Sequence, residues 1–241
     1  MQITASIVIY KEDKEVLKES IESFLSIPLK KELIIVDNSP SEELRVFCET
    51  FQNTIYIKSK KNIGFGAGHN LAFQNFTLSS TIHLIINPDT YFVSSDIKEF
   101  LEWFYISKDI SLATPQVFYP DGSVQNIARN IPTPLSLIKR RLNIDTDELI
   151  VKDNFIEDIP FAHGCFMVFK TEAFKKLDGF DERYFMYMED IDIFIRAKKF
   201  GKTVINTNYN IYHHYKKGSS KSIKLLCLHI ISAIKFFSKA I

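Results

Sequence analysis

An aspartate stands directly beyond a strand-like run at residues 82–89, which read Ile-His-Leu-Ile-Ile-Asn-Pro-Asp. The run does not alternate between apolar and polar residues, which is typical of a strand buried on both faces of a parallel sheet. Pro88 has no N–H to donate, so the strand must end before it. Asp89 is therefore expected past the carboxyl end of a central strand, where open α/β sheets bind ligands and where a carboxylate can hold a divalent cation against a diphosphate. The same residues also suit an ordinary turn, and this run alone does not separate the two interpretations.

A second aspartate, Asp37, ends the aliphatic run Leu33–Val36 in the same way and is followed by Asn38. Because the carboxyl ends of parallel strands meet at one edge of a sheet, Asp37 and Asp89 are expected at the same edge. An acid on the earlier strand can accept hydrogen bonds from a ribose or a base edge, which leaves the later acid for a metal. The alternative is that Asp37-Asn38-Ser39 only begins a helix.

Glycines are concentrated in Asn62–Asn70, which follows the third predicted strand. Glycines let backbone approach a ligand closely and present N–H groups to a phosphate. The spacing is G-x-G-x-G and it follows the third strand, so it is not the dinucleotide-binding fingerprint.

Three acids, Glu189, Asp190 and Asp192, fall within the first turn of a predicted helix. Acids at a helix N-terminus are favoured by the helix dipole, so simple capping is one explanation. The preceding segment, Gly179–Tyr187, is too aromatic for a solvated surface loop. Acids behind an aromatic wall can form a general-base site, in which partial burial tunes the pKa.

Two adjacent histidines, His213 and His214, follow the last predicted strand. Neighbouring residues of an extended chain point to opposite sides, so at most one of them is expected to reach a metal together with Asp89. The alternative is a basic surface patch that continues into Lys216-Lys217.

The pattern of apolar residues predicts an α/β chain in which strands and helices alternate through the first hundred residues, as in a parallel sheet with right-handed crossovers. Strands are predicted at 5–10, 33–36, 55–57, 82–86, 161–169 and 203–206, and helices at about 13–26, 39–51, 70–78, 95–107, 171–177 and 187–200. Ser39 is the predicted cap of the second helix, Pro115 is assigned to a loop, and residues 130–158 show no clear period.

Size and composition place the chain among ordinary globular proteins, because 241 residues with 46% hydrophobic and 24% charged residues can bury a sizeable core. Cys48, Cys165 and Cys227 are far apart and odd in number, which predicts a reducing compartment without a disulfide framework or zinc site. No signal peptide is visible at Met1, and no apolar run approaches the roughly 18 residues of a membrane span.

Charge is unevenly distributed along the chain. Residues 193–241 carry ten Lys or Arg and no Asp or Glu, whereas the remainder has a net charge of −9. Such an asymmetry indicates an anionic partner, either a membrane surface or nucleic acid. The pattern of residues from about Ser219 to Ile241 predicts a basic amphipathic helix that binds an anionic membrane. The alternative is that this helix packs on its own domain. Nucleic acid is not expected as the partner, because it gives the apolar face of that helix no role.

Taken together and in order, these motifs resemble those of the family-2 inverting glycosyltransferases of GT-A fold, in particular the bacterial rhamnosyltransferase-like group that builds O-antigen and capsule. The stretches that carry the resemblance span nearly the whole chain to about residue 215, and they are Ser6–Tyr10, Val36–Asn38, Asn62–Asn70, Asn87–Asp89, Asp121–Gln125 with Arg129, Gly164–Val168, Gly179–Phe185, Glu189–Asp192 with Arg196, and His213-His214.

The resemblance implies a role for individual residues. It implies that Asp190 is the catalytic base with Glu189 beside it, that Asp89 holds Mg²⁺ or Mn²⁺, and that His213 or His214 adds a contact to the metal or diphosphate. The residues that it assigns to nucleotide-sugar binding are Tyr10, Asp37, Asn38, Asn62, Gly64, Gly66, Asn70, Asn87, Arg129 and Gly164. One departure is Asn87, which stands at the first position of the D-x-D element and leaves fewer carboxylates for the cation.

The resemblance also implies a function. Residues 1–215 would form the catalytic domain of a cytoplasmic enzyme, peripheral on the inner face of the bacterial inner membrane, with residues 216–241 as its basic tail. It would transfer a sugar, with dTDP-rhamnose as the favoured donor, to an undecaprenyl-diphosphate-linked saccharide. Alternatives are a transferase of a hexose or galactofuranose from a UDP donor, a nicotinamide-dependent oxidoreductase, and a non-catalytic sugar- or lipid-binding module on the same fold.

Overall fold

The computed structural model describes residues 1–142, 144, 148–151, 156–215 and 222–239. In this part of the chain, nine strands form one mixed sheet in the order β3-β2-β1-β4-β10-β6-β11-β5, with β8 paired to β11. Their bounds are β1 Gln2–Ile9, β2 Lys30–Asp37, β3 Thr54–Lys58, β4 Ile82–Ile86, β5 Thr90–Tyr91, β6 Ile110–Phe118, β8 Ile156–Asp158, β10 Phe166–Lys170 and β11 Lys202–His213. A small second sheet pairs β7 (Ala128–Arg129) with β9 (Phe161–Ala162).

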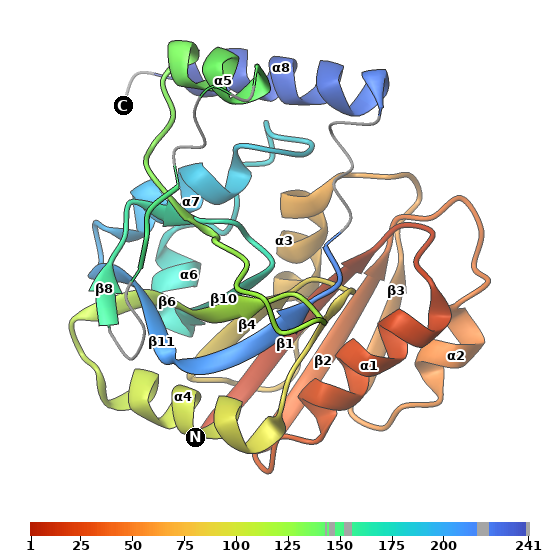
Figure 1. The fold of residues 1–241 in the computed structure, drawn as a ribbon. Coiled ribbons are helices and arrows are strands. Elements are labelled where there is room, and N and C mark those ends of the chain that lie inside the picture. The colour runs from red at the N-terminus through yellow and green to blue at the C-terminus, as the bar shows by residue number, and fades with distance from the viewer. Residues whose placement is uncertain (143, 145–147, 152–155, 216–221, 240–241) are drawn as a thin grey trace.

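Helices cover both faces of the large sheet. In Figure 1, α3, α6 and α7 lie above the sheet, and α1 and α4 lie below it. The helices are α1 Lys14–Leu25, α2 Arg45–Glu49, α3 Phe65–Asn75, α4 Ser94–Ile106, α5 Pro134–Arg141, α6 Thr171–Lys176, α7 Glu189–Ala197 and α8 Ile223–Ser238. The α/β fold with a C-terminal helix is therefore confirmed.

The first four strands form the parallel part of the sheet, as their uninterrupted aliphatic runs predict. β3, β2, β1 and β4 pair in parallel with one another. β10 is antiparallel to both of its neighbours, and the last long strand, β11, lies parallel to β6. The side chains of Leu33–Val36 and Leu84–Ile86 are fully buried. The carboxyl ends of β1, β2 and β4 thus share one edge of the sheet, from which Tyr10, Asn38 and Asn87 follow.

The third helix begins before its predicted start at about residue 70, because α3 already begins at Phe65, within the glycine-rich stretch Asn62–Asn70. A Cβ at Gly66 would lie 2.8 Å from the Phe180 side chain, and one at Gly68 would lie 2.7 Å from Val8 on β1. These glycines therefore allow close packing of a helix, and a propensity-based assignment misses them because glycine usually weakens helices.

Three further boundaries differ from the predictions. Ser39 does not cap a helix, since α2 begins only at Arg45, and its hydroxyl accepts instead from the backbone N–H of Lys11. Pro115 lies inside β6, where the ladder with β11 becomes irregular beyond the Pro115–Asn206 pair and can accommodate a residue without an N–H. The predicted strand 161–169 is divided into β9 and β10 by residues 163–165.

The later elements also end differently from the predictions. α7 begins at Glu189, two residues after the predicted start, and β11 extends to His213. Within the irregular stretch 130–158, α5 was missed, although Thr133 and Ser136 form a capping box with Pro134 at the first position. Of the predicted tail helix, 223–238 is helical, while residues 216–221 and 240–241 lie outside the described residues, as do 143, 145–147 and 152–155 of the stretch before β8.

The aromatic segment 179–188 is fixed against α3 by one side-chain amide. Asn70 donates from Nδ2 to the Phe180 carbonyl (2.9 Å) and to the Glu182 carboxylate (3.0 Å), and its Oδ1 accepts from the Phe180 N–H (2.8 Å). Gly179 has φ +63°, and a Cβ there would lie 2.2 Å from the Asn70 amide oxygen. Only glycine at position 179 therefore allows the backbone to come this close to the Asn70 side chain.

We expect Asn70→Ala to lower the free energy of unfolding by about 1–3 kcal/mol, because it leaves buried polar groups of Phe180 without partners. Asn75→Ala is the matched control, because Asn75 lies on the same helix and its amide reaches only the Leu71 carbonyl at the surface. Its effect is expected within about 0.5 kcal/mol. Urea unfolding measures both, and equal losses would mean that Asn70 does not fix the segment.

Candidate functional site

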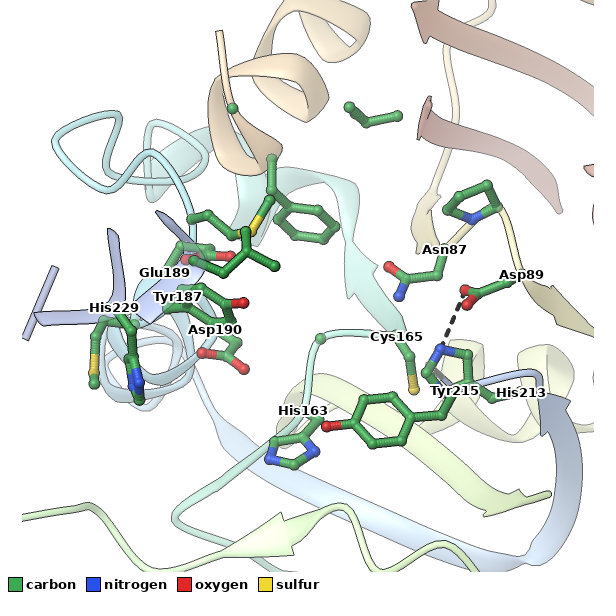
Figure 2. A pocket seen from close by; sticks show the side chains of 18 of the residues that line it. Asn87, Asp89, His163, Cys165, Tyr187, Glu189, Asp190, His213, Tyr215 and His229 are labelled. Carbon is green, nitrogen blue, oxygen red and sulfur yellow. Dashed lines mark ion pairs between the residues drawn. The ribbon is translucent and has the colours of Figure 1, made fainter. Parts of the chain in front are cut away.

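A pocket of about 870 Å³ opens at the carboxyl edge of the parallel strands. Segments from almost every part of the fold line it, including the ends of β1, β4 and β11 and the start of α7. The predicted site residues among its lining are Tyr10, Asn38, Asn62, Gly64, Asn87, Asp89, Arg129, Gly164, Glu189, Asp190 and His213. In Figure 2, Asp89 and His213 lie on one side of this pocket, and Glu189 and Asp190 lie on the other.

The turn after β4 places Asp89 against the end of β11. The Asp89 carboxylate lies 3.2 Å from Nε2 of His213, and the backbone N–H of His214 donates to the Asp89 carbonyl at 2.9 Å. The next residue, Thr90, pairs with His213 across β5 and β11. Two chain segments more than a hundred residues apart thus fix one carboxylate.

Electrostatics keep Asp89 ionised. Burial raises the pKa of Asp89, but the hydrogen bond and charge of His213 outweigh it and hold that pKa below its usual value. For His213, burial lowers the pKa, while Cys165 and Asp89 raise it to about 10. On its other side, His213 Nδ1 lies 3.2 Å from Oε1 of Gln125. A carboxylate that stays negative in a partly buried pocket is suited to a cation or to a positively charged donor group.

A divalent cation fits this corner only if a ligand completes its coordination. Among residues that the structure describes, no cluster of three or more His, Cys, Asp or Glu side chains is arranged to hold a metal ion. The amide oxygen of Asn87, two residues before Asp89, is buried without a hydrogen-bond partner. Mg²⁺ and similar ions are commonly held by one or two carboxylates together with substrate phosphates. Asp89 and Asn87 fit such a shared site.

The acid pair on the opposite side is presented by a strained turn. Tyr187 and Met188 both have left-handed backbone conformations, with φ of +70° and +72°, immediately before α7. Non-glycine residues rarely adopt this conformation, and two in succession persist only where the surroundings impose them. The segment 185–188 is fixed because the Phe185 carbonyl accepts a hydrogen bond from the Phe65 N–H at 3.1 Å. The chain also passes close to Gly64, where a Cβ would lie 2.2 Å from the Phe185 carbonyl oxygen.

Neighbouring charges and hydrogen bonds separate the ionisation of Glu189 from that of Asp190. Desolvation raises the pKa of both carboxyls, and the charge of Asp190 raises that of Glu189 further. Hydrogen bonds from the Ile191 and Gly164 backbone oppose the shift at Asp190. One carboxylate oxygen of Glu189 has no hydrogen-bond partner. Glu189 is therefore the member of the pair that retains a proton, and Asp190 is the member that ionises.

The first two strands end in a hydrogen-bonded network at the pocket edge. Asn38 donates to the Gly64 carbonyl at 3.0 Å, and the Gly64 N–H donates to Asn62 at 2.9 Å. Asp37 is almost fully buried; its carboxylate accepts from the Tyr56 hydroxyl at 2.5 Å and from the Ser39 N–H at 2.7 Å. Asp37 thus shapes the edge next to Asn38 but is not among the residues that line the pocket.

Arg129 meets a histidine that the sequence analysis did not assign to the site. Its Nε donates to His163 Nε2 at 2.9 Å, and its guanidinium pairs with Glu148 at 3.0 Å. Burial, followed by the charge of Arg129, lowers the pKa of His163 to about 3, so the imidazole is neutral. Gly164 follows it, beside Asp190. The break between β9 and β10 is therefore part of the pocket.

Three other predicted residues lie outside the pocket lining. Gly66 is a packing position in α3, and Asn70 is occupied by the 179–188 segment. His214 pairs with Glu19 at 2.9 Å and packs on the Tyr91 ring, so His213 is the histidine that faces Asp89. The lining residues to which the sequence analysis gave no role include Gln125, Cys165, Tyr187 and Tyr215. Gln125 and Cys165 lie within stretches that carry the resemblance, and Tyr187 and Tyr215 lie close to such stretches.

Comparison with known proteins identifies the family of the chain. Residues 4–178 match the family described as Glycosyl transferase family 2. The chain belongs to glycosyl transferase family 2. The match ends before α7 and β11, so the acid pair and His213 are contributed by a part of this glycosyltransferase that lies beyond it.

Curated relatives are similar at low identity. The chain is 29% identical over 170 residues to the low-salt glycan biosynthesis hexosyltransferase Agl10 of Haloferax volcanii, which covers 70% of the chain and 53% of the relative. It is 22% identical over 244 residues to rhamnosyltransferase WbbL of Escherichia coli, covering 97% and 92%. It is 26% identical over 149 residues to the N-acetylglucosaminyl-diphospho-decaprenol L-rhamnosyltransferase of Mycobacterium tuberculosis, covering 54% and 46%. The chain thus spans about half the length of the first and third of these relatives.

Solved glycosyltransferases share the fold. GalNAc-T7 with UDP, GalNAc and Mn²⁺ superposes with a TM-score of 0.70 at 14% identity, covering 89% of this chain and 43% of that one. The mannosyltransferase PcManGT of Pyrobaculum calidifontis, in complex with GDP-Man and Mn²⁺, superposes with a TM-score of 0.64 at 14% identity, covering 97% and 64%. These likenesses confirm the GT-A type of fold.

The raised pKa of Glu189 predicts a pH dependence of stability. A carboxyl whose pKa is raised on folding contributes stability that is fully present below its unfolded pKa and is lost as pH rises through the folded value. We therefore expect the Glu189 carboxyl to contribute a fall in the free energy of unfolding between about pH 5 and pH 8, so that the native chain loses stability relative to Glu189→Gln as the pH rises through this range.

Urea titrations at several pH values measure the difference. Glu172→Gln, an exchange of an exposed glutamate in the first turn of α6, serves as the control and is expected to retain the native slope. An unchanged slope in Glu189→Gln would show that this carboxyl does not retain its proton on folding.

Proposed function

We propose that this chain transfers a sugar, with inversion at the anomeric carbon, from a nucleotide donor to a lipid-linked saccharide. One observation supports the proposal above all others: Asp89 and Asp190 face a single pocket from opposite sides, and their environments favour different ionisation behaviour. The ionised Asp89 suits the cation that accompanies the charged diphosphate. Asp190, whose pKa is raised, suits proton transfer near neutral pH.

The donor would bind along the edge formed by the first, second and fourth strands. Asn38, Asn62 and Gly64 would contact the nucleoside together with Tyr10, and Asp37 would support them from below. Asp89 and the Asn87 amide oxygen would hold Mg²⁺ or Mn²⁺ beside the diphosphate, with His213 adjacent. When bound, the cation offsets the negative charge that develops on the departing nucleoside diphosphate.

Transfer would follow a single displacement. Asp190 accepts the proton of the acceptor hydroxyl as its oxygen forms a bond to the anomeric carbon, and the bond from that carbon to the diphosphate oxygen breaks. The electron pair of the broken bond leaves with the nucleoside diphosphate. Glu189, which retains its proton, would orient the acceptor or the loop, because adjacent residues of a helix diverge by about 100° and cannot both face one hydroxyl.

Rhamnose from dTDP-rhamnose is the favoured donor, since two of the relatives are named as rhamnosyltransferases. A hexose or galactofuranose from a UDP donor is the alternative, and the Haloferax relative is named as a hexosyltransferase. By analogy with the relative whose name specifies N-acetylglucosaminyl-diphospho-decaprenol, the acceptor would be an undecaprenyl-diphosphate-linked saccharide. Residues 1–215 would then act as the catalytic domain at the inner face of a bacterial membrane, and the basic tail would contact that membrane.

We expect Asp89→Ala to abolish turnover and the part of nucleoside diphosphate binding that depends on metal. In the native chain, UDP or dTDP at about 100 times its dissociation constant with Mn²⁺ should stabilise by about 2.7 kcal/mol, which is a rise of roughly 5–10 °C in melting temperature. Asp89→Ala should lose the increment that Mn²⁺ adds, whereas Asp37→Ala should bind more weakly with or without Mn²⁺.

Asp109→Ala is the control for this comparison, because Asp109 is exposed and pairs with Lys202 far from the pocket. It should keep the full thermal shift. If Mn²⁺ adds the same thermal shift in Asp89→Ala as in the native chain, the metal does not bind at this corner of the pocket.

For the acid pair, Asp190→Asn is expected to lower kcat by about 10²–10⁴-fold or more without weakening donor binding, because a general base acts in the transition state. Glu189→Gln should mainly raise the KM of the acceptor. Steady-state kinetics separate the two, and a retained thermal shift with nucleoside diphosphate verifies folding. A near-normal kcat in Asp190→Asn together with a collapse in Glu189→Gln would assign the base to Glu189.

A further inference from the structure

The C-terminal helix α8 packs on the protein with its polar side. Ser232 donates to the Met186 carbonyl at 2.8 Å, Lys235 donates to the Arg183 carbonyl at 2.7 Å, and Lys239 pairs with Asp181 at 3.0 Å. His229 packs on the Tyr187 ring, with ring centroids 4.9 Å apart. α8 is therefore anchored through its polar residues to the segment that presents the acid pair.

This orientation leaves the apolar side of α8 uncovered. Ile223, Ile230, Ile234 and Phe237 expose 82%, 50%, 64% and 37% of their surface. Their spacing places them on one face of the helix, opposite Ser232 and the buried Phe236. A helix whose apolar face points away from its own protein lacks the packing that normally stabilises it.

A second helix at the same end of the molecule has the same property. In α5, Leu135 and Ile138 expose 61% and 58%, and Leu142, directly after the helix, exposes 63%. They recur at i, i+3 and i+7, while Leu137 packs inward against the core. Figure 1 shows α5 and α8 together at one end of the molecule, remote from α2 and α4. We call these exposed residues of α5 and α8 the two-helix apolar face.

Both helices also border the pocket. Arg140 of α5 and Leu225 and His229 of α8 contribute to its lining, alongside Glu189 and Asp190. The two-helix apolar face therefore adjoins the side of the pocket at which the acceptor would enter.

Charge indicates what covers this face. α5 and α8 contain no Asp or Glu, while Lys139 and Lys224 are exposed beside the apolar residues. A surface that combines exposed Ile and Leu with flanking cations is suited to the interface of an anionic bilayer, where the apolar side chains enter the acyl boundary and each Lys meets headgroups. Within the described residues, no helix is long and apolar enough to cross a membrane.

We propose that the two-helix apolar face docks this enzyme on an anionic membrane, with the mouth of the pocket facing the lipid surface. This inference rests on the proposed function, and it adds α5 to the membrane contact and fixes which side of α8 meets the bilayer. Docking in this orientation would bring the diphosphate of a lipid-linked acceptor to the pocket while its lipid remains in the bilayer.

Sedimentation of the full chain with phosphatidylcholine vesicles, with and without phosphatidylglycerol, tests the docking. The native chain should bind the anionic vesicles, and added salt should weaken that binding through screening. The double variants Ile230→Ser/Ile234→Ser and Leu135→Ser/Ile138→Ser should each lower the partition coefficient by about tenfold or more. The matched control Val46→Ser/Ile106→Ser makes the same change at sites on α2 and α4 that are 77% and 72% exposed, and should leave it unaltered.

Thermal shifts with UDP or dTDP and Mn²⁺, measured on the same variants, separate the docking from the proposed function. The substituted residues lie outside the pocket lining, so each variant should keep the native shift, which also verifies folding. Loss of vesicle binding with a native shift supports the docking. Nucleotide binding without vesicle binding in the native chain overturns the docking alone, and vesicle binding without nucleotide binding overturns the proposed function alone.

Analytical ultracentrifugation provides the last comparison. If the native chain is a dimer that the α5 and α8 variants dissociate, while vesicle binding is absent or unchanged, the two-helix apolar face is a contact between copies of this chain. A control variant that loses as much vesicle binding as the α8 variant would overturn the docking as well.

Discussion

The side-chain amide of Asn70 joins the two halves of this pocket. Asn70 lies on α3, which is pressed against β1 through Gly68, and its amide holds the backbone at Phe180. The segment that follows leads directly to Glu189. The sheet edge and the acid pair belong to parts of the chain about 110 residues apart, and this contact holds the two parts together. A small displacement of reacting groups is costly in catalysis, which makes a rigid connection between the two sides valuable.

Within the pocket, aspartates of one chemical type are set to different tasks by their surroundings. Asp89 is stabilised as an anion by a neighbouring imidazolium, whereas burial raises the pKa of Asp190 more than its backbone hydrogen bonds and the charge of Arg140 lower it. Such a division of ionisation between acids of one pocket is a common basis for acid–base assignment. Here it follows from which strand or helix end each acid occupies.

The sequence predicted the parts of this fold that depend on local pattern. The aliphatic runs before Asp37 and Asp89 identified two buried parallel strands and the edge at which they end. The positions of individual side chains in space were not predictable from the pattern, because they depend on residues that are distant in the chain. Gly66 packs against Phe180, and His213 rather than His214 faces Asp89. His163 was not predicted, because it lies in the short break between β9 and β10. The periodicity of apolar residues identifies helices and strands but does not show that such a break turns a side chain toward a pocket. The side of α8 that contacts the protein was likewise not predictable from the sequence, since both sides of its helical wheel are plausible packing surfaces.

The position of β11 between β6 and β5 also bears on how the chain folds during its synthesis. Translation completes β5 and β6 long before β11 emerges, so on the ribosome an edge of the sheet stays open for on the order of ten seconds at ordinary elongation rates. During that interval Asp89 lacks His213, and β6 presents unpaired N–H and C=O groups that favour aberrant association. The nascent chain therefore exposes this edge until the last strand is inserted.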